Sequence, residues 1–365
     1  MSNYMNLNKL LTTIALLCVL VTKLSFSAEE LYFPDSDSDW ETVAPSKVGW
    51  NQDLLNEALK LAGERKSSGV LILHNGRIMA ERYWSEPDIS IRYKNFLQGF
   101  DSQNRAIEDV ASAQKNITTV LVGMAQARGF LSLEDSVTSH LGTAWSKAPM
   151  PREAAITIYD LLTMTSGLAS DLTYETEPGE KWLYNTPAYH FLMRVVSTAT
   201  KTPREVLTRE WLTSPLGMTS SSWTPRDWTG SDIGVGFSTT ARDLARFGLF
   251  IQAGGRWDNE IIFRDSEFIE AMMKPAQDIN PSYGYLWWLN GQAFSLGFTP
   301  QTVRRDGQLI PSAPDDLVAM QGALDRKLYL VPSLNLIVTR LGSNGSAGGQ
   351  SFNEAFWGAL MRAKQ

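Results

Sequence analysis

Apolar and polar positions at the two ends of the chain follow the pattern of paired β-strands. Residues 70–83 form two β-rich runs on either side of Asn75-Gly76. This dipeptide is typical of a type I′ turn, because both central residues of that turn need a positive φ angle. Residues 327–341 repeat the arrangement around a Pro-Ser-Leu-Asn turn. The sequence therefore predicts a β-hairpin near each end.

Between the hairpins, apolar residues recur at helical spacing. The strongest case is residues 117–125, where apolar side chains stand at i, i+3, i+4, i+7 and i+8, and Gly129 supplies a C-terminal stop. Further helices are predicted from residue 51, from the Thr157 cap, from about residue 239 and over residues 352–360. The stretch 85–109 is polar, and we expect it to be irregular.

This order of elements predicts an α/β fold of the α+β type. Strands from both chain ends build one antiparallel sheet that is flanked by helices, and a mostly helical subdomain is inserted into it. The sheet-containing part is expected at about residues 47–110 and 230–365, and the helical part at about 111–229.

The first residues have the pattern of a secretory signal peptide. Lys9 precedes the apolar run 10–21, and small residues follow it. We expect a signal peptide over residues 1–27, an uncleaved anchor being the alternative, and a hydrolase domain over 28–365. Cleavage implies a periplasmic or secreted protein without a stable membrane anchor. Cys18, the only cysteine, lies inside this run, so residues 28–365 contain no thiol nucleophile, disulfide or cysteine metal ligand.

Composition and charge narrow the possible partners. The 365 residues are 43% hydrophobic and carry a net charge of -6, or -8 without Lys9 and Lys23. Such a balance gives no electrostatic reason to expect nucleic acid as a partner. The three histidines lack metal-ligand spacing, and no phosphate-cradling glycine loop is present, so we expect neither metal nor cofactor. No Gly-x-Ser-x-Gly elbow points to an α/β-hydrolase triad.

The residues that carry the chemistry are Ser112 and Lys115, at the start of the predicted helix 117–125. Positions three apart lie on one helix face, so the lysine amine can reach the serine hydroxyl. A neutral lysine is a competent general base, and burial lowers its pKa. A helix N-terminus also offers N–H groups where an oxyanion would form. The plain alternative is a serine near a helix start with a solvated lysine.

Several blocks, taken in order, favour the catalytic interpretation. The sequence Asp-Val-Ala-Ser-Ala-Gln-Lys at 109–115 resembles the first motif of serine β-lactamases, DD-peptidases and related esterases. Further similar blocks stand at 161–168, 178–189, 238–246 and 283–288. The chain is thus similar to the penicillin-recognising serine hydrolases related to class C β-lactamases, over most of its length. The resemblance implies a β-lactamase/transpeptidase-like fold.

The resemblance also implies roles for individual residues. Ser112 would attack a carbonyl carbon, and Tyr184 would exchange the proton as a phenolate held near Lys115. The backbone N–H groups of Ser112 and Ala323 would form the oxyanion hole, with Gly322 on the strand that lines the cleft. Asn185 and Thr186, which follow the motif tyrosine, would contact the substrate.

Two positions depart from the family pattern. The second motif usually reads Tyr-x-Asn, and Thr186 stands at its third place. The third motif usually has a lysine or histidine two places before a glycine, and here Met320-Gln321-Gly322 stand there. Arg326 or Lys327 is expected as the source of a nearby positive charge. Both departures weaken an antibiotic-hydrolysing function more than they weaken an enzymatic one.

The sequence therefore predicts an exported serine hydrolase that cleaves an ester or amide of a small molecule. The segments 109–115 and 330–342 resemble 6-aminohexanoate-dimer hydrolases and carboxylesterases. The alternatives are a cell-wall DD-peptidase or amidase, a β-lactamase, and a catalytically weak binding protein on the same scaffold. The pair Trp287-Trp288 is expected either in the core or in the wall of the cleft.

Overall fold

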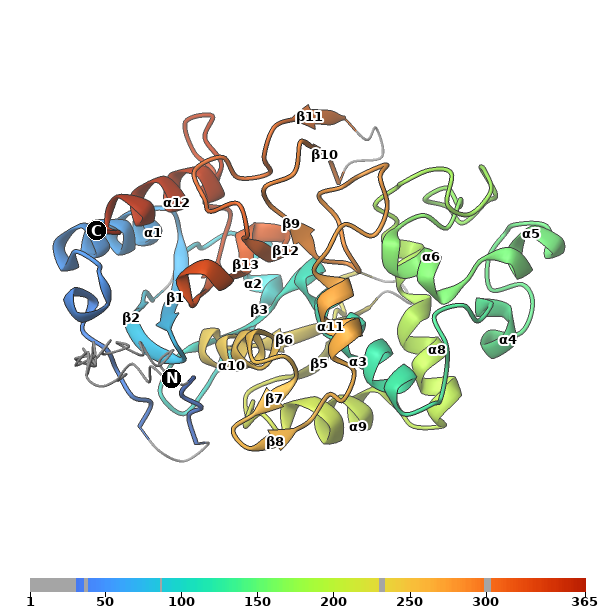
Figure 1. The fold of residues 1–365 in the computed structure, drawn as a ribbon, viewed down its shortest axis with the longest axis horizontal. Coiled ribbons are helices and arrows are strands. Elements are labelled where there is room, and N and C mark those ends of the chain that lie inside the picture. Colours follow the sequence, from blue (N-terminus) through green and yellow to red (C-terminus); the bar gives the residue numbers. More distant parts are fainter. Residues whose placement is uncertain (1–30, 36–38, 86, 230–233, 299–302) are drawn as a thin grey trace, which may run out of the picture. The chain divides into compact units, whose positions relative to one another are not determined.

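The computed structural model describes residues 31–35, 39–85, 87–229, 234–298 and 303–365. The predicted signal peptide, residues 1–27, lies outside them. Figure 1 traces the chain from α1 (Gln52–Glu64) to α12 (Phe352–Arg362). Among the described residues, no helix has both the length and the apolar character needed to cross a membrane.

A six-stranded antiparallel sheet joins the two ends of the chain, as predicted. Its order is β2 (Arg77–Tyr83), β1 (Ser67–His74), β14 (Leu336–Gly342), β13 (Arg326–Val331), β12 (Val318–Gly322) and β9 (Trp288–Leu289). Both predicted hairpins are confirmed: β1 pairs with β2, and β13 pairs with β14. Asn75 and Gly76 have φ angles of 49° and 81°, as a type I′ turn requires.

Helices cover both faces of this sheet. Helix α10 (Ala241–Gln252) packs so closely on one face that a Cβ on Gly248 would lie 2.8 Å from a methyl of Leu328. The next residue of β13, Tyr329, points to the other face, where its ring meets Trp357 of α12 at 5.3 Å. Leu328 and Tyr329 therefore give β13 an apolar side chain on each face, and the strand is buried between two helical layers.

A second, four-stranded sheet lies beside the first. Its order is β3 (Leu97–Phe100), β4 (Ala106–Asp109), β6 (Val235–Thr239) and β5 (Ser222–Pro225), and α2 (Ile91–Phe96) precedes β3. The prediction that residues 85–109 are irregular is wrong. The strands in this segment are too short and polar to show a strand pattern. Its last two carboxylates, Glu108 and Asp109, are buried because distant arginines pair with them.

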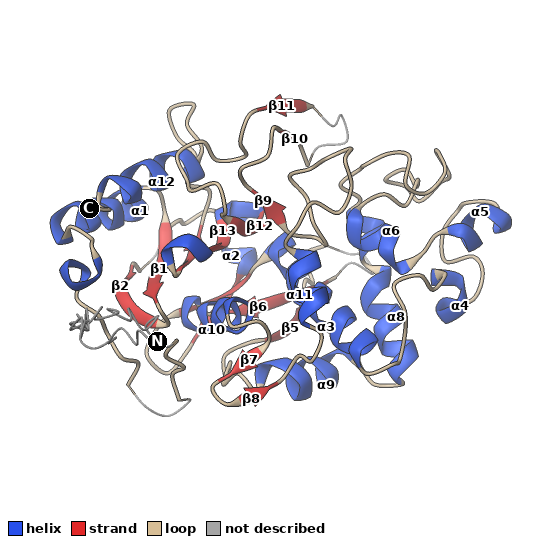
Figure 2. Cartoon of the chain, in the orientation of Figure 1, coloured by secondary structure: helices blue, strands red, loops and turns tan. Residues whose placement is uncertain are grey.

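The helical part surrounds α3 (Gln114–Ala127), which is buried along its length from Gln114 to Ala125. Figure 2 shows α3 between the strands and the other helices of this part. The predicted capping box at Thr157 is confirmed at α6 (Ile158–Thr163). The other helices here are α4 (Val137–Leu141), α5 (Met150–Ala155), α7 (Thr186–Tyr189), α8 (Phe191–Thr200) and α9 (Arg204–Thr208).

Short elements complete the described chain. After α10 come β7 (Arg256–Trp257), β8 (Glu260–Ile261), α11 (Ser266–Met272), β10 (Phe294–Leu296) and β11 (Arg304–Asp306). The segment that enters β9 is fixed to α3, because Asn116 Nδ2 donates to the Leu286 carbonyl (3.0 Å) and the Thr119 hydroxyl donates to the Tyr285 carbonyl (3.0 Å). These bonds bring the 283–288 block against the helix that follows Ser112.

Candidate active site

Ser112 stands on a sharp turn between β4 and α3. The Ala111 N–H donates to the Asp109 carboxylate (2.8 Å), and Ala111 has a φ angle of 51°, which a residue with a side chain rarely adopts. Both alanines that flank the serine, Ala111 and Ala113, are buried, whereas Ser112 is only half-buried. The turn therefore exposes the one side chain that carries a nucleophile.

Lys115 is buried one turn further along α3. Its Nζ lies 4.8 Å from the centre of the Tyr184 ring and 4.5 Å from that of Tyr189. Burial, aided by the positive charge of Arg226, lowers the pKa of Lys115 to about 7. A substantial part of this lysine is therefore neutral at neutral pH, as a general base requires.

Tyr184 lies near Ser112. The nearby Ser112 hydroxyl lowers the pKa of the Tyr184 phenol, but burial outweighs this effect and raises that pKa. The phenolate form expected from the sequence is therefore disfavoured in the resting site, where Tyr184 is a neutral phenol. Of the two candidate proton acceptors, Lys115 is the one whose pKa moves toward neutrality.

Aromatic rings form a wall beside Tyr184. The Trp288 ring stacks on it at 5.9 Å with an interplanar angle of 24°, and the Tyr283 ring meets it edge-on at 6.3 Å. Trp287 stacks instead on Phe247 of α10, at 6.4 Å. The pair was expected either in the core or in the wall of the cleft. Trp287 lies in the core, and Trp288 lies beside the site.

Strand β12 ends against the Ser112 turn. A Cβ on Gly322 would lie 2.1 Å from the Val110 carbonyl oxygen and 3.3 Å from the Ala113 nitrogen. The glycine is needed because two backbones meet there. Ala323, the next residue, is exposed at the end of the strand and close to the turn.

The residues expected to supply a third-motif cation are engaged elsewhere. Arg326 is fully buried, and its Nη2 lies 2.8 Å from the Glu108 carboxylate. The Lys327 amine donates to Gln321 Oε1 (2.8 Å) and lies 3.5 Å from the Asp325 carboxylate. Met320 is buried in the core. Neither Arg326 nor Lys327 is thus an unpaired cation beside Ser112, contrary to expectation.

Asn185, expected to contact the substrate, is buried and makes its side-chain hydrogen bonds inside the protein. Its Nδ2 donates to the carbonyls of Leu168 (2.9 Å) and Ala169 (3.0 Å), and its Oδ1 accepts the Ala188 N–H (3.1 Å) and so caps α7. These bonds fix the loop that carries Tyr184. Thr186, the first residue of α7, is half-buried.

The structure adds Arg226, which the sequence analysis missed. Its guanidinium binds Asp109 through two hydrogen bonds (2.6 and 2.8 Å) and donates to Gln114 Oε1 (3.0 Å). It therefore holds the turn before Ser112, and its charge acts on Lys115. Arg226 follows directly after the short strand β5, and no local motif marks it. Tyr189 lies in the motif block 178–189, but the sequence alone indicates no role for it.

One histidine lies beside the site. Burial lowers the pKa of His190 to about 3, so this ring beside Lys115 and Tyr189 stays neutral. Within the described ranges, no group of three histidine, cysteine, aspartate or glutamate side chains could hold a metal ion.

Sequence relatives span much of the chain at low identity. An uncharacterized protein from Alkalihalophilus pseudofirmus is 23% identical over 315 residues, which are 78% of this chain and 86% of that protein. Protein flp from Staphylococcus aureus is 23% identical over 199 residues, which are 48% of this chain and only 38% of that protein.

Solved structures show the same fold. A Bacillus anthracis protein described as a 6-aminohexanoate-dimer hydrolase matches with a TM-score of 0.63 at 17% identity, covering 90% of this chain and 88% of that one. A penicillin-binding protein homologue from Pyrococcus abyssi matches with a TM-score of 0.57 at 16% identity, covering 85% and 76%. The predicted β-lactamase/transpeptidase-like fold is thereby confirmed.

The beta-lactamase family model matches residues 53–341, a span that runs from α1 to the end of the main sheet. Ser112, Lys115 and Tyr184, which the fold brings together, all lie inside this match. The chain therefore belongs to the beta-lactamase family of serine hydrolases.

Proposed function

We propose that this chain is an exported serine hydrolase that cleaves an ester or amide of a small molecule through an acyl-enzyme on Ser112. The observation that carries the proposal is the buried Lys115 amine, with a pKa of about 7, which lies 4.8 Å from the centre of the Tyr184 ring next to Ser112. A nucleophile, a proton relay and a neutral base thus lie near one another. Export is supported by the signal-like sequence 1–27 alone.

In the acylation step, Ser112 Oγ attacks the carbonyl carbon, and its proton passes through the Tyr184 hydroxyl to the neutral Lys115 amine. The carbonyl oxygen becomes an oxyanion. When it collapses, the bond to the leaving group breaks, and the proton returns along the same path to the leaving alkoxide or amine. In deacylation, water attacks the ester carbonyl with the same groups as base and acid, and Ser112 leaves as its alcohol.

The oxyanion is proposed to bind the backbone N–H groups of Ser112 and Ala323. The close contact of Gly322 with the Ser112 turn supports this, because it holds the end of β12 beside the nucleophile. Removing one such donor costs other enzymes about 10²–10³-fold in kcat. Thr186 is proposed to contact the substrate from the start of α7.

Two features favour neutral substrates of the carboxylesterase or amidase type. One is the aromatic wall beside Tyr184, and the other is that neither Arg326 nor Lys327 is an unpaired cation. Tyr184, which is half-buried and backed by the Trp288 ring, offers apolar surface. Arg326 and Lys327 both have acidic partners. A DD-peptidase, a β-lactamase or a catalytically weak binding protein would be the alternative functions on this scaffold.

The test is hydrolysis of a short p-nitrophenyl ester, with mass spectrometry after reaction with a fluorophosphonate. We expect one adduct on Ser112 of the parent protein, and no adduct or turnover in Ser112→Ala. Tyr184→Phe and Lys115→Met should each lower kcat by about 10²–10⁴-fold, and the losses should not add in the double variant. A parent that binds the ester without turnover or adduct would be a binding protein.

A further inference from the structure

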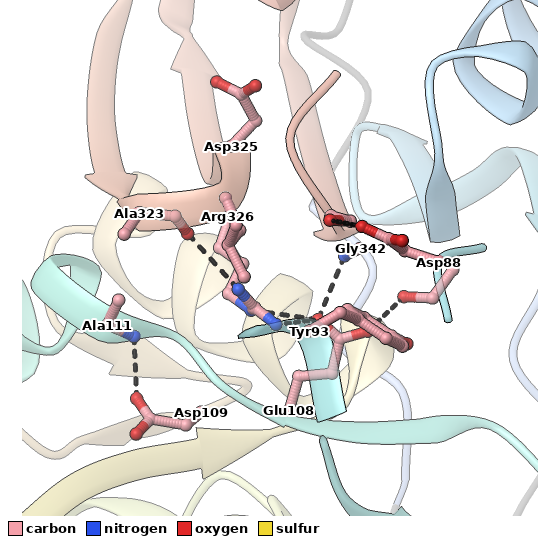
Figure 3. A network of polar contacts seen from close by, with 12 residues as sticks. Asp88, Tyr93, Glu108, Asp109, Ala111, Ala323, Asp325, Arg326 and Gly342 are labelled. Atoms are coloured by element: carbon pink, nitrogen blue, oxygen red, sulfur yellow. Dashed lines mark hydrogen bonds and ion pairs between the residues drawn. The ribbon is translucent and has the colours of Figure 1, made fainter. Parts of the chain in front are cut away.

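Strand β4 ends in two consecutive buried carboxylates, Glu108 and Asp109, which bind different arginines. Neighbouring residues of a strand point to opposite faces, so Glu108 and Asp109 diverge. Asp109 accepts the Ala111 N–H beside Ser112 and binds Arg226. Glu108 turns toward the main sheet and binds Arg326 of β13. Figure 3 shows Asp109 beside the Ala111 N–H, and Glu108 beside Arg326, Tyr93 and Gly342.

The Glu108 carboxylate is fully buried and fully hydrogen-bonded. Its Oε2 accepts from Arg326 Nε (2.9 Å) and from the Gly342 N–H (3.0 Å). Its Oε1 accepts from the hydroxyls of Ser68 and Tyr93. One side chain thereby ties together β4, β1, β14, β13 and α2. Burying a charged pair is costly, and such pairs often stabilise a fold no better than apolar residues of the same size.

Arg326 carries the connection on to the proposed oxyanion backbone. Its Nη1 donates to the Ala323 carbonyl (3.3 Å), and its guanidinium lies 4.8 Å from the centre of the Phe96 ring. Leu324, with a φ angle of 60°, packs with Phe96 and Ala111 in a small cluster apart from the main core. The backbone on either side of Ser112 and Ala323 is therefore braced by the same few residues.

We propose that Glu108 and Arg326 are positioning residues that hold the end of β12, with Ala323, against the turn that carries Ser112. This inference rests on the proposed function, in which the N–H groups of those two residues bind the oxyanion. One N–H comes from each sheet, so the distance between them depends on how the sheets are joined. Glu108 joins them through Arg326 of β13, while Asp109, the next residue of β4, holds the turn that carries Ser112.

Displacing an oxyanion donor weakens transition-state binding more than substrate binding. We therefore expect Glu108→Gln to lower kcat for a short p-nitrophenyl ester by about 10–100-fold, with KM within about twofold of the parent value. Glu153→Gln is the matched control. Glu153 is also buried and accepts two backbone N–H groups, those of Ala144 and Ser146, in the helical part. It should lose stability with kcat unchanged.

The double variant Glu108→Gln/Arg326→Met separates positioning from folding. Each single variant leaves one buried charge without its partner, so unfolding should shift to lower urea concentration. The double variant removes both charges and should recover much of that stability. Its kcat should stay low, because Arg326→Met removes the hydrogen bond to the Ala323 carbonyl. Recovery of kcat together with stability would overturn the proposal, as would a double variant that fails to fold.

Fluorophosphonate labelling distinguishes the two hypotheses. If the parent reacts at Ser112 and Glu108→Gln hydrolyses the ester as fast as Glu153→Gln, only the positioning role is wrong. If the parent neither reacts with the fluorophosphonate nor hydrolyses the ester, the proposed function is wrong, and so is the positioning role. Labelling of the parent, together with slow turnover only in the Glu108 and Arg326 variants, is the expected result.

Discussion

The Lys115 amine nitrogen lies 4.8 Å from the centre of the Tyr184 ring, over its face. A charged amine is attracted to an aromatic face, whereas burial favours the neutral amine. Burial prevails and brings the lysine pKa to about 7, while it raises the pKa of the tyrosine. The pair thus consists of one group that titrates in the neutral range and one that does not.

The pH dependence of the reaction should report Lys115. A base must be unprotonated, so kcat/KM for a p-nitrophenyl ester should rise with pH and level off above a midpoint of about 7. The raised pKa of Tyr184 means that no second limb from phenol ionisation should follow within the neutral range. Stopped-flow or steady-state rates across this range provide the measurement, and a flat profile would exclude Lys115 as the base.

The free energy of unfolding should also depend on pH through Lys115, and it should rise with pH. Since the pKa of Lys115 is lower in the folded state than in the unfolded chain, the unfolded chain binds more protons between about pH 7 and pH 10.4. The burial cost is therefore fully present below about pH 7 and fades as pH rises through that window. Lys115→Met should stabilise the protein at about pH 6 and do so less at about pH 9.

Urea unfolding of parent and Lys115→Met at both pH values measures this difference. Because both proteins share all other titrating groups, the change in their difference isolates the lysine. Tyr189→Phe is a useful companion, since the Tyr189 ring contacts the amine at 4.5 Å while its hydroxyl lies 2.9 Å from Thr118 Oγ1. It keeps the ring and should keep the pH effect. A Met variant whose advantage grows with pH would contradict the burial argument.

The sequence predicts the fold well where the signal is local. The Asn75-Gly76 turn, the Thr157 capping box and the helix after Ser112 all depend on neighbouring residues, and all are confirmed. The pairing of β1 with β14 follows from strands at both ends. The family motifs then place Ser112, Lys115 and Tyr184 in one match, and the structure brings them together.

Features that depend on distant partners were not predictable in this way. The strand β4 is hidden in a polar segment, because Glu108 needs Arg326, 218 positions away, to be buried. Arg226 stands 117 positions from Asp109 and carries no motif. The direction of the Tyr184 pKa shift also depends on burial by Trp288 and Tyr283, which come from a later segment.

The contact of Gly322 with the Ser112 turn leads to a further prediction. Gly322→Ala would place a methyl carbon 2.1 Å from the Val110 carbonyl oxygen, so β12 must move away from the turn. We expect kcat to fall by about 10²–10³-fold, because an oxyanion donor is displaced. Circular dichroism and thermal unfolding verify that the variant remains folded.

Gly358→Ala is the control for this substitution. Gly358 lies within α12, where an added Cβ has only an ordinary contact at 3.9 Å, and alanine favours a helix by roughly 1 kcal/mol. This variant should keep its activity. Full activity in Gly322→Ala would mean that the end of β12 does not take part in the reaction.

The last prediction concerns the substrate class. Penicillins and cephalosporins carry a carboxylate beside the reactive ring, and a charge-assisted hydrogen bond to it contributes about 1.5–3 kcal/mol. That is roughly ten- to a hundredfold in binding. Here Met320 is buried, Gln321 accepts from Lys327, and Lys327 has Asp325 beside it. The antibiotic carboxylate would thus find no unpaired cation among these residues.

We therefore expect a higher kcat/KM for a short-chain p-nitrophenyl ester than for nitrocefin, with at most trace β-lactamase activity. Asp325→Asn gives the matched test, because it removes the acidic partner of Lys327 at 3.5 Å and leaves Ser112, Lys115 and Tyr184 untouched. If the ion pair with Asp325 keeps Lys327 from the antibiotic carboxylate, the kcat/KM of this variant for nitrocefin should rise relative to its kcat/KM for the ester. A parent that prefers nitrocefin by more than about tenfold, a difference of about 1.4 kcal/mol, would show that a cation already reaches the carboxylate.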